Sequence, residues 1–380
     1  MVWRRHTQRT YQNWHLVRKS GDALYYILTQ FNLMKSKGMA PKTSWEESML
    51  QLANNFVNLW EKHHQLGQFI DTPSGDIVVG GSTSGAIVPA GLLLAASYFQ
   101  QEGFKQSAIE IADHYYQQYV VNGICCGGPG DALQNPDSES AYAMLQSFVD
   151  VYYATKSKRW LQRAEEMAAL FTTWVMPYDY CFPARSALGM LKVQTTGTVW
   201  ANTQNKHAAP GICTYAGGAY LHLFRATGNI QYFETLSDII KVATQYLSST
   251  QRPIEKMRPG WMSERINTCD WLEGIGELMY GSTWAETSLM LAYAQLPGLY
   301  INPATKQCLA LDMVEATVEN EKNESMIILK NSSELSCSFR IGIDMDPGQI
   351  DAIEYKTIEM QGGANRMLSF GGELVQELIF

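Results

Sequence analysis

Two acidic side chains at the start of a predicted helix could perform acid–base chemistry. Asp137 and Glu139 follow the Gly/Pro-rich loop GGPGDALQNP and precede an apolar helical pattern. We expect Asn135 to cap this helix and Pro136 to follow in its first turn, which places both acids at the N-terminal end. Because residues two apart on a helix point in different directions, at most one of the two should face a pocket. The alternative is that both acids only stabilise the helix dipole, by about 0.3–1 kcal/mol each.

A second acidic stretch, NTCDWLEGIGELMYGSTWAETS at residues 267–288, alternates carboxylates with aromatic rings. A glycoside-cleaving site needs this combination, because one carboxyl donates a proton, another is ionised, and sugar rings stack on aromatic faces. The alternative is a surface loop followed by a capped helix. We expect the catalytic pair to combine Asp137 or Glu139 with Asp270 or Glu273. The side chains expected to bind substrate are those of Trp200, His207, Tyr215, Trp261, Trp271, Tyr280, Trp284 and Glu286.

Paired helices are predicted to position these residues. Amphipathic helices with an aromatic residue near their start alternate with more apolar helices rich in Ala, Gly and Ser. This alternation indicates an outer set and a closely packed inner set. The predicted positions are 12–34, 44–63, 84–101, 104–120, 137–154, 160–175, 209–226, 232–247 and 282–296.

The connections between these helices alternate between short and long. In an up-and-down array every second connection emerges at the same end, so we expect the long loops to gather there. Loops of this length in a compact domain usually carry function. They also hold many of the aromatic residues, which favours a ligand platform over plain core. The long loops are at 66–82, 121–136, 178–208 and 249–281.

The sequence changes character after Pro303, where short runs such as MIILK and SCSFRIGID are separated by turn-forming segments. Alternating and β-branched runs of this kind indicate strands. We therefore expect two domains, a helical domain over residues 1–303 and a small antiparallel, β-sandwich-like domain over residues 304–380.

Paired helices, long loops at one end and a terminal β domain resemble the six-hairpin glycosidase superfamily, the α/α-toroid enzymes. The stretches GQFIDTPSGDIVVGGSTSGA, GGPGDALQNPDSESA and CTYAGGAYLHLFRATGN are similar to a bacterial branch of it. The resemblance covers about residues 10–300. It implies a mainly α toroid of five to six helical hairpins and a glycoside hydrolase, mostly of the inverting type, that acts on an oligosaccharide or glycan-derived substrate. It assigns no catalytic residues.

Two other functions remain open on the same scaffold. One is a different sugar enzyme, either an epimerase or an unsaturated-uronide hydrolase. An epimerase would need paired histidines facing the cavity, whereas only seven histidines occur and His63 and His64 fall on an outer helix. The other is a toroid without activity that binds a glycan or a partner protein. Such a fold can be retained as a scaffold after its catalytic acid or base is lost.

Composition narrows the classes of partner. The net charge of −8 argues against nucleic-acid binding, which needs clustered Lys and Arg. No apolar run is long enough to span a membrane, and the start MVWRRH lacks the apolar core of a signal peptide, so we expect a cytoplasmic protein. The seven scattered cysteines are expected to be reduced, mostly buried thiols. Neither metal-ligand spacing nor a phosphate-binding glycine loop occurs, so no metal and no cofactor is expected. The oligomeric state is left open.

Overall fold

The computed structural model describes residues 2–4, 9–11, 13–269, 274–279, 284–321 and 324–378. The chain divides into two compact units. The first comprises Met1–Trp174 and Trp200–Lys206, and the second comprises Val175–Val199 and His207–Phe380. Within the described ranges, no helix has both the length and the apolar character that a membrane crossing requires.

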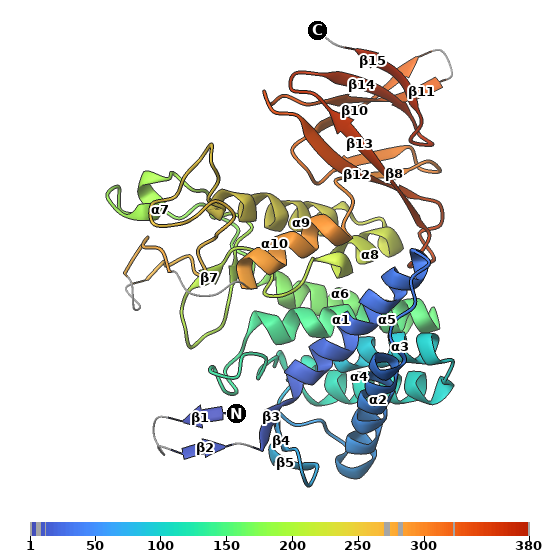
Figure 1. The fold of residues 1–380 in the computed structure, drawn as a ribbon, viewed down its shortest axis with the longest axis vertical. Helices are drawn as coiled ribbons and strands as arrows, with labels where there is room; N and C mark the ends of the chain where they lie inside the picture. The colour runs from blue at the N-terminus through green and yellow to red at the C-terminus, as the bar shows by residue number, and fades with distance from the viewer. Residues whose placement is uncertain are drawn as a thin grey trace. The chain divides into compact units, whose positions relative to one another are not determined.

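The first unit is built from three pairs of helices (Figure 1). Inner and outer helices alternate along the chain, and α3 packs against both α1 and α5. Glycine permits this close approach: a β-carbon on Gly21 of α1 would lie 2.8 Å from Cγ2 of Ile87, just before α3. The helices are α1 (Val17–Ser36), α2 (Thr43–His63), α3 (Val88–Phe99), α4 (Glu102–Gln118), α5 (Ser138–Thr155) and α6 (Lys158–Thr172). These helices lie where the apolar periodicity predicts them.

Short strands connect these helices. A hairpin follows α2, in which β4 (Phe69–Asp71) pairs antiparallel with β5 (Asp76–Val79). On its other edge, β4 pairs with β3 (Trp14–Leu16), which leads directly into α1. Strand β1 (Val2–Arg4) pairs with β2 (Arg9–Tyr11). A single-turn helix, η1 (Val120–Asn122), follows α4.

The second unit contains the remaining helices, α7 (Ala187–Met190), α8 (Gly218–Thr227), α9 (Ile230–Ala243), η2 (Thr244–Tyr246) and α10 (Trp284–Gln295). Helix α8 starts nine residues later than the prediction of 209, because Gly211, Thr214 and Gly217 adopt positive φ angles that a helix excludes. Within the described residues, α10 is followed by strands and not by a second helix, so the count of five to six hairpins stays a prediction. The short strands β6 (Val199–Trp200) and β7 (Ala208–Ala209) flank the segment that returns to the first unit.

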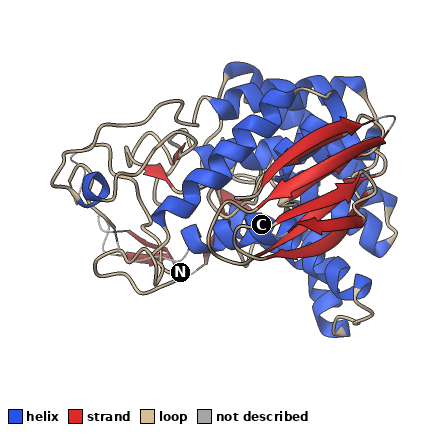
Figure 2. Ribbon diagram, turned by 90° about the horizontal axis from the view of Figure 1, so that it is seen from above, coloured by secondary structure: helices blue, strands red, loops and turns tan. Residues whose placement is uncertain are grey.

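The C-terminal strands form two four-stranded sheets, in the orders β13-β12-β8-β9 and β10-β11-β14-β15 (Figures 1 and 2). Apolar side chains of both sheets, such as Leu299, Phe339 and Leu368, make one buried core, as in a sandwich. The strand pairs within residues 304–380 are antiparallel, as predicted, whereas β8, which precedes this range, runs parallel to β12. The strands are β8 (Leu299–Asn302), β9 (Gln307–Ala310), β10 (Glu315–Glu321), β11 (Glu324–Lys330), β12 (Cys337–Asp344), β13 (Ile353–Met360), β14 (Asn365–Ser369) and β15 (Leu374–Leu378).

Strand β8 begins four residues before Pro303, so the first sheet already includes residues from before the predicted boundary. The division into domains at residue 303 therefore stays a prediction, whereas the sandwich itself is described by its strands and its core.

A buried ion pair joins α8 to this sandwich. The Nε and Nη2 atoms of Arg225 donate to the two carboxylate oxygens of Asp344, each at 2.9 Å, and both side chains are fully buried. Arg225 also donates to the carbonyl oxygens of Gln349 at 2.7 Å and Ile350 at 3.0 Å. The hydroxyl of Tyr300 donates to Asp344 at 2.6 Å. Every charge of the pair is thus compensated, which a buried ion pair requires.

His222 completes this network. Its Nδ1 lies 3.0 Å from Nη1 of Arg225. Burial and the positive charge of Arg225 lower the pKa of His222 to about 3. The ring is therefore neutral near pH 7, and its Nδ1 accepts a hydrogen bond from the guanidinium.

Candidate active site at the helix N-termini

The two long loops of the first unit contact each other at the N-terminal ends of α3 and α5. The backbone N–H of Thr83 donates to the carbonyl oxygen of Cys126 at 3.0 Å, and the hydroxyl of Thr83 accepts from Cys126 N–H at 2.9 Å. The side chain of Gln68 donates to the carbonyl oxygen of Leu133 at 2.7 Å. The predicted gathering of long loops therefore holds within this unit.

In the second unit, the part of the 178–208 loop before Trp200 contacts the loop that follows η2. Leu188 N–H donates to the carbonyl oxygen of Gly276 at 2.8 Å. The hydroxyl of Tyr246 donates to the carbonyl oxygen of Gln194 at 3.2 Å. Irregular backbone from distant parts of the chain thus meets in each unit, and segments of this kind often carry binding residues.

Asp137 caps α5 with a buried carboxylate. Its two oxygens accept from Ser140 N–H at 2.6 Å, Ser140 Oγ at 3.0 Å and Gly128 N–H at 3.1 Å. The cap is therefore Asp137 and not Asn135, whose amide donates to Ala132 and Gln204. The side chain is fully buried, so in this structure its carboxylate holds the glycine loop onto the helix.

Burial raises the pKa of Asp137 to about 7, and the negative charge of Glu139 acts in the same direction. The hydrogen bonds from Ser140 and Gly128 favour the ionised form and oppose this rise. A carboxyl with this pKa is protonated in part near neutral pH. That property suits a general acid, although the full burial of Asp137 leaves it no contact with solvent.

Glu139 is less buried than Asp137 and forms an ion pair with Arg18 of α1. Arg18 also pairs with Asp22 on its own helix, with 3.0 Å between Nε and Oδ2. All three side chains are largely buried, and that of Glu139 is 12% exposed. The result is a compact group of two carboxylates around one guanidinium, between the first turns of α1 and α5.

Buried polar atoms without partners gather near the start of α10. Glu286 accepts from Met262 N–H at 2.9 Å through Oε1, whereas its buried Oε2 has no hydrogen-bond partner among the residues that the structure describes. The same is true there of Nε and Nη1 of Arg265 and of the hydroxyl of Thr268. Buried polar atoms are normally satisfied. Several unsatisfied ones in one segment therefore point to a polar ligand.

The aromatic residues predicted to bind substrate lie in different environments. Trp261 is 48% exposed, and the guanidinium carbon of Arg258 lies 5.7 Å from its ring centroid. Trp200 and Trp284 are half-buried. Tyr215 is buried, and its carbonyl oxygen accepts from Ser288 Oγ at 3.1 Å. The exposed ring of Trp261 is the one best placed for stacking.

His207 is buried and its Nδ1 donates to the carbonyl oxygen of Ala208 at 2.9 Å. This contact gives the ring a structural role, because it binds a backbone group. Its role in substrate binding stays a prediction. Four other predicted residues lie outside the described residues: Asp270, Trp271, Glu273 and Tyr280.

The cysteines of the long loops offer no assembled metal site. Cys125 and Cys126 are buried, and burial raises the pKa of both thiols. Cys181 is exposed on the loop that precedes α7. Among the described residues, no three His, Cys, Asp or Glu side chains come together in a way that could hold a metal ion.

Comparison with solved structures identifies the fold. The chain is similar to a D-mannose isomerase, with a TM-score of 0.50 and 9% sequence identity over 76% of this chain and 72% of that one. This likeness shows the fold alone, that of the six-hairpin α/α toroids. No family model matches the sequence, and no curated protein is detectably similar to it.

Two further matches have this six-hairpin fold at lower similarity. A cellobiose 2-epimerase from Bacillus thermoamylovorans matches with a TM-score of 0.48 and 8% identity over 76% of this chain and 74% of that chain. An unsaturated glucuronyl hydrolase specific for heparin matches with a TM-score of 0.46 and 14% identity over 73% of each chain.

Sequence reasoning missed three side chains of the candidate site: Arg18, Arg265 and Thr268. Arg18 could have been singled out from the sequence. A positive charge in the first turn of a helix is opposed by the helix dipole and needs an anionic partner. Asp22, four residues later, supplies one such partner. Arg265 and Thr268 lie in irregular chain, where no periodicity marks the buried side.

Protonation of Asp137 is expected to make stability depend on pH. An aspartate in an unfolded chain titrates near about 4, so between about pH 4 and 7 the folded protein holds a proton that the unfolded chain has lost. The contribution of Asp137 to the free energy of unfolding therefore falls as the pH rises through this window, by up to about 1.4 kcal/mol per pH unit. Asp137→Asn keeps an oxygen for capping and does not titrate. Urea unfolding between pH 4.5 and 7.5 should show a flatter profile for this variant, and equal profiles would contradict the assignment.

Proposed function

We propose that the protein is a carbohydrate-active enzyme, a glycoside hydrolase of the inverting type that uses two carboxylates at the loop-bearing helix N-termini. The observation that carries this proposal is the group of unsatisfied buried polar atoms on Arg265, Thr268 and Glu286. A sugar offers several hydroxyl groups that both donate and accept, so it can satisfy such a group. The nearby exposed ring of Trp261, on the same loop as Arg265, suits sugar stacking.

The carboxylates take different roles in this proposal. Glu139 is the anionic member of an ion pair, and so suits the base that activates water. Asp270 or Glu273 would supply the second carboxyl as the acid. Inversion requires roughly 6.5–9.5 Å between the two carboxyl groups, which leaves room for the attacking water. In this scheme Asp137 is not a proton donor or acceptor. It positions Glu139 by holding the glycine loop onto the start of α5.

An unsaturated-uronide hydrolase is the second candidate, and one observation favours it. Two nitrogens of the Arg265 guanidinium are buried without a partner in the described part of the chain. Guanidinium groups bind carboxylates strongly, and a uronide carries a carboxylate. An epimerase gains less support, because His207 binds a backbone carbonyl and His222 is buried against Arg225.

A substrate panel tests the proposal and separates the two candidates. Aryl glycosides, neutral oligosaccharides and unsaturated uronides are incubated with the protein, and released sugars are measured. We expect hydrolysis of at least one class. Glu286→Gln should raise KM about tenfold, because a buried acceptor loses its charge. Glu277→Gln, whose exposed side chain lies on the neighbouring segment, is the matched control and should leave KM unchanged.

Two outcomes would count against hydrolysis. Absence of activity on every class, together with binding of a panel sugar, would favour a toroid that only binds glycans. Isomerisation of a free sugar without bond cleavage would favour the isomerase class.

A further inference from the structure

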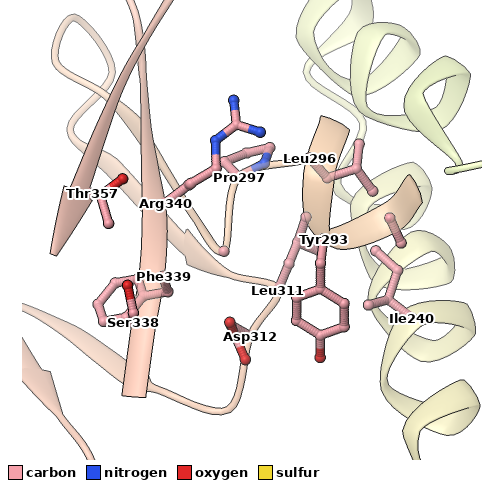
Figure 3. A pocket seen from close by; sticks show the side chains of 12 residues that line it. Ile240, Tyr293, Leu296, Pro297, Leu311, Asp312, Ser338, Phe339, Arg340 and Thr357 are labelled. Atoms are coloured by element: carbon pink, nitrogen blue, oxygen red, sulfur yellow. The ribbon is translucent and has the colours of Figure 1, made fainter. Parts of the chain in front are cut away.

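A second cavity lies at the other end of α10, between this helix, α9 and the sandwich (Figure 3). Its volume is about 160 Å³. Tyr293 lines it from the last turn of α10, Leu296 lines it from just beyond that helix, and Phe339 lines it from β12. Glu286 stands about two helical turns before Tyr293, which is roughly 10 Å along the axis at 1.5 Å per residue. No residue of the candidate active site lines the cavity.

The walls of this cavity combine apolar and hydroxyl-bearing side chains. Leu296 and Leu311 supply apolar surface, and Ser338 and Thr357 bring hydroxyl groups from β12 and β13. Tyr293 is 42% exposed, so a large part of its ring is open to a ligand. In Figure 3 the Tyr293 ring and the carboxylate of Asp312 stand next to each other. An open aromatic face beside a carboxylate is suited to a sugar ring.

The two carboxylate oxygens of Asp312 lie in different surroundings. Its Oδ1 accepts from Met313 N–H at 2.7 Å. Its Oδ2 lies 3.3 Å from the point that a β-carbon on Gly298 would occupy, and Gly298 belongs to the cavity wall. Oδ2 of Asp312 therefore lies close to the backbone that lines the cavity. In that position it can accept hydrogen bonds from the hydroxyl groups of a ligand.

The charges at the cavity favour a neutral ligand. The guanidinium of Arg340 is engaged elsewhere: it lies 3.9 Å from the ring centroid of Tyr355 and donates to the carbonyl oxygen of Ala294. Asp312 repels anions, and the nearby guanidinium disfavours cations. The hydroxyl groups and the carboxylate disfavour a purely apolar chain, because their hydrogen bonds to water would be lost.

We propose that this cavity binds one neutral sugar residue at a site separate from the candidate active site. Its volume is below the roughly 300–1,000 Å³ of cavities for drug-sized ligands, so one ring fits better than an oligosaccharide chain. The Tyr293 ring stacks on the sugar, and Asp312, Ser338 and Thr357 bind its hydroxyl groups. This inference is independent of the proposed hydrolysis, since the two sites share no residue.

Binding measurements test the site directly. Methyl glycosides of glucose, galactose, mannose and xylose are titrated into the full chain by calorimetry, with ligand-observed NMR as a second readout. We expect at least one to bind. Tyr293→Ala and Asp312→Asn should each weaken its binding about tenfold or more. Met290→Ala changes an exposed side chain of α10 that does not line the cavity, and it should bind like the unchanged protein.

The same titrations with Glu286→Gln distinguish the two sites. Binding to the cavity should be unaffected by this change. The proposal is overturned if none of the glycosides binds, if Glu286→Gln abolishes binding that Tyr293→Ala leaves intact, or if the methyl glycoside of glucuronic acid binds more tightly than the neutral sugars. Thermal unfolding of each variant confirms folding, and Asp312→Asn, which conserves size, decides the result if Tyr293→Ala does not fold.

Discussion

Replacing Arg225 by methionine is expected to lower the free energy of unfolding of the second unit by about 3–5 kcal/mol. The change leaves the carboxylate of Asp344 fully buried without its countercharge. It also removes the donor to the carbonyl oxygens of Gln349 and Ile350. The cost of an uncompensated buried charge exceeds that of the lost attraction, because the carboxylate cannot regain water. Chemical denaturation followed by circular dichroism measures the effect.

The double variant Arg225→Met with Asp344→Asn is the control for this reading. It removes both charges, while the asparagine oxygen can still accept from Tyr300. We expect it to recover a large part of the lost stability, since a neutral pair avoids the desolvation penalty. A single variant as stable as the unchanged protein would show that the buried pair contributes nothing. If the double variant is no more stable than Arg225→Met alone, the loss of stability comes from contacts other than the charge pair.

Replacing Glu139 by glutamine is expected to lower kcat/KM by about 10²–10⁴-fold on the substrate that the panel identifies. The amide keeps the size of the side chain and cannot accept a proton from water. Asp22→Asn is a matched control, because it neutralises the other carboxylate that pairs with Arg18. Both variants weaken the same ion-pair group, so a purely structural role would affect activity equally in the two.

The comparison of these two variants decides the role of Glu139. We expect Asp22→Asn to keep activity within a few-fold of the unchanged protein and to lose a similar amount of thermal stability. Equal activity of both variants, with stability reduced in each, would assign Glu139 to the ion pair alone. Asp270→Asn and Glu273→Gln, measured in the same assay, then show which of the two is the acid.

The positions of the helices could be predicted because their signal is local. The amphipathic pattern that starts near Trp160 became α6 (Lys158–Thr172), and the apolar pattern after Asp137 became α5. The cap of α5 was misplaced by two residues. A proline in the first turn is common, but here the extended backbone of Asp137, with φ −145° and ψ 149°, places its own carboxylate on Ser140 N–H.

The site itself was less predictable, because its contacts join distant parts of the chain. Arg18 and Glu139 are 121 residues apart, and no local pattern pairs them. Tyr215 was predicted to bind substrate because it lies near a long loop, but position in the sequence does not give the direction of a side chain. Its ring is in fact buried. Glu286 was predicted from its aromatic neighbours, and the structure adds the unsatisfied oxygen that makes it a sharper candidate.

The bond between α8 and β12 has a consequence for cooperativity. If the sandwich detaches, the Arg225 guanidinium loses the carboxylate of Asp344 and the carbonyl oxygens of Gln349 and Ile350, and keeps its contact with His222 on the same helix. Helices α8 and α9 and the eight terminal strands should therefore melt in a single transition. Their most protected amides should exchange with solvent at one common rate, whichever of the two structures they belong to.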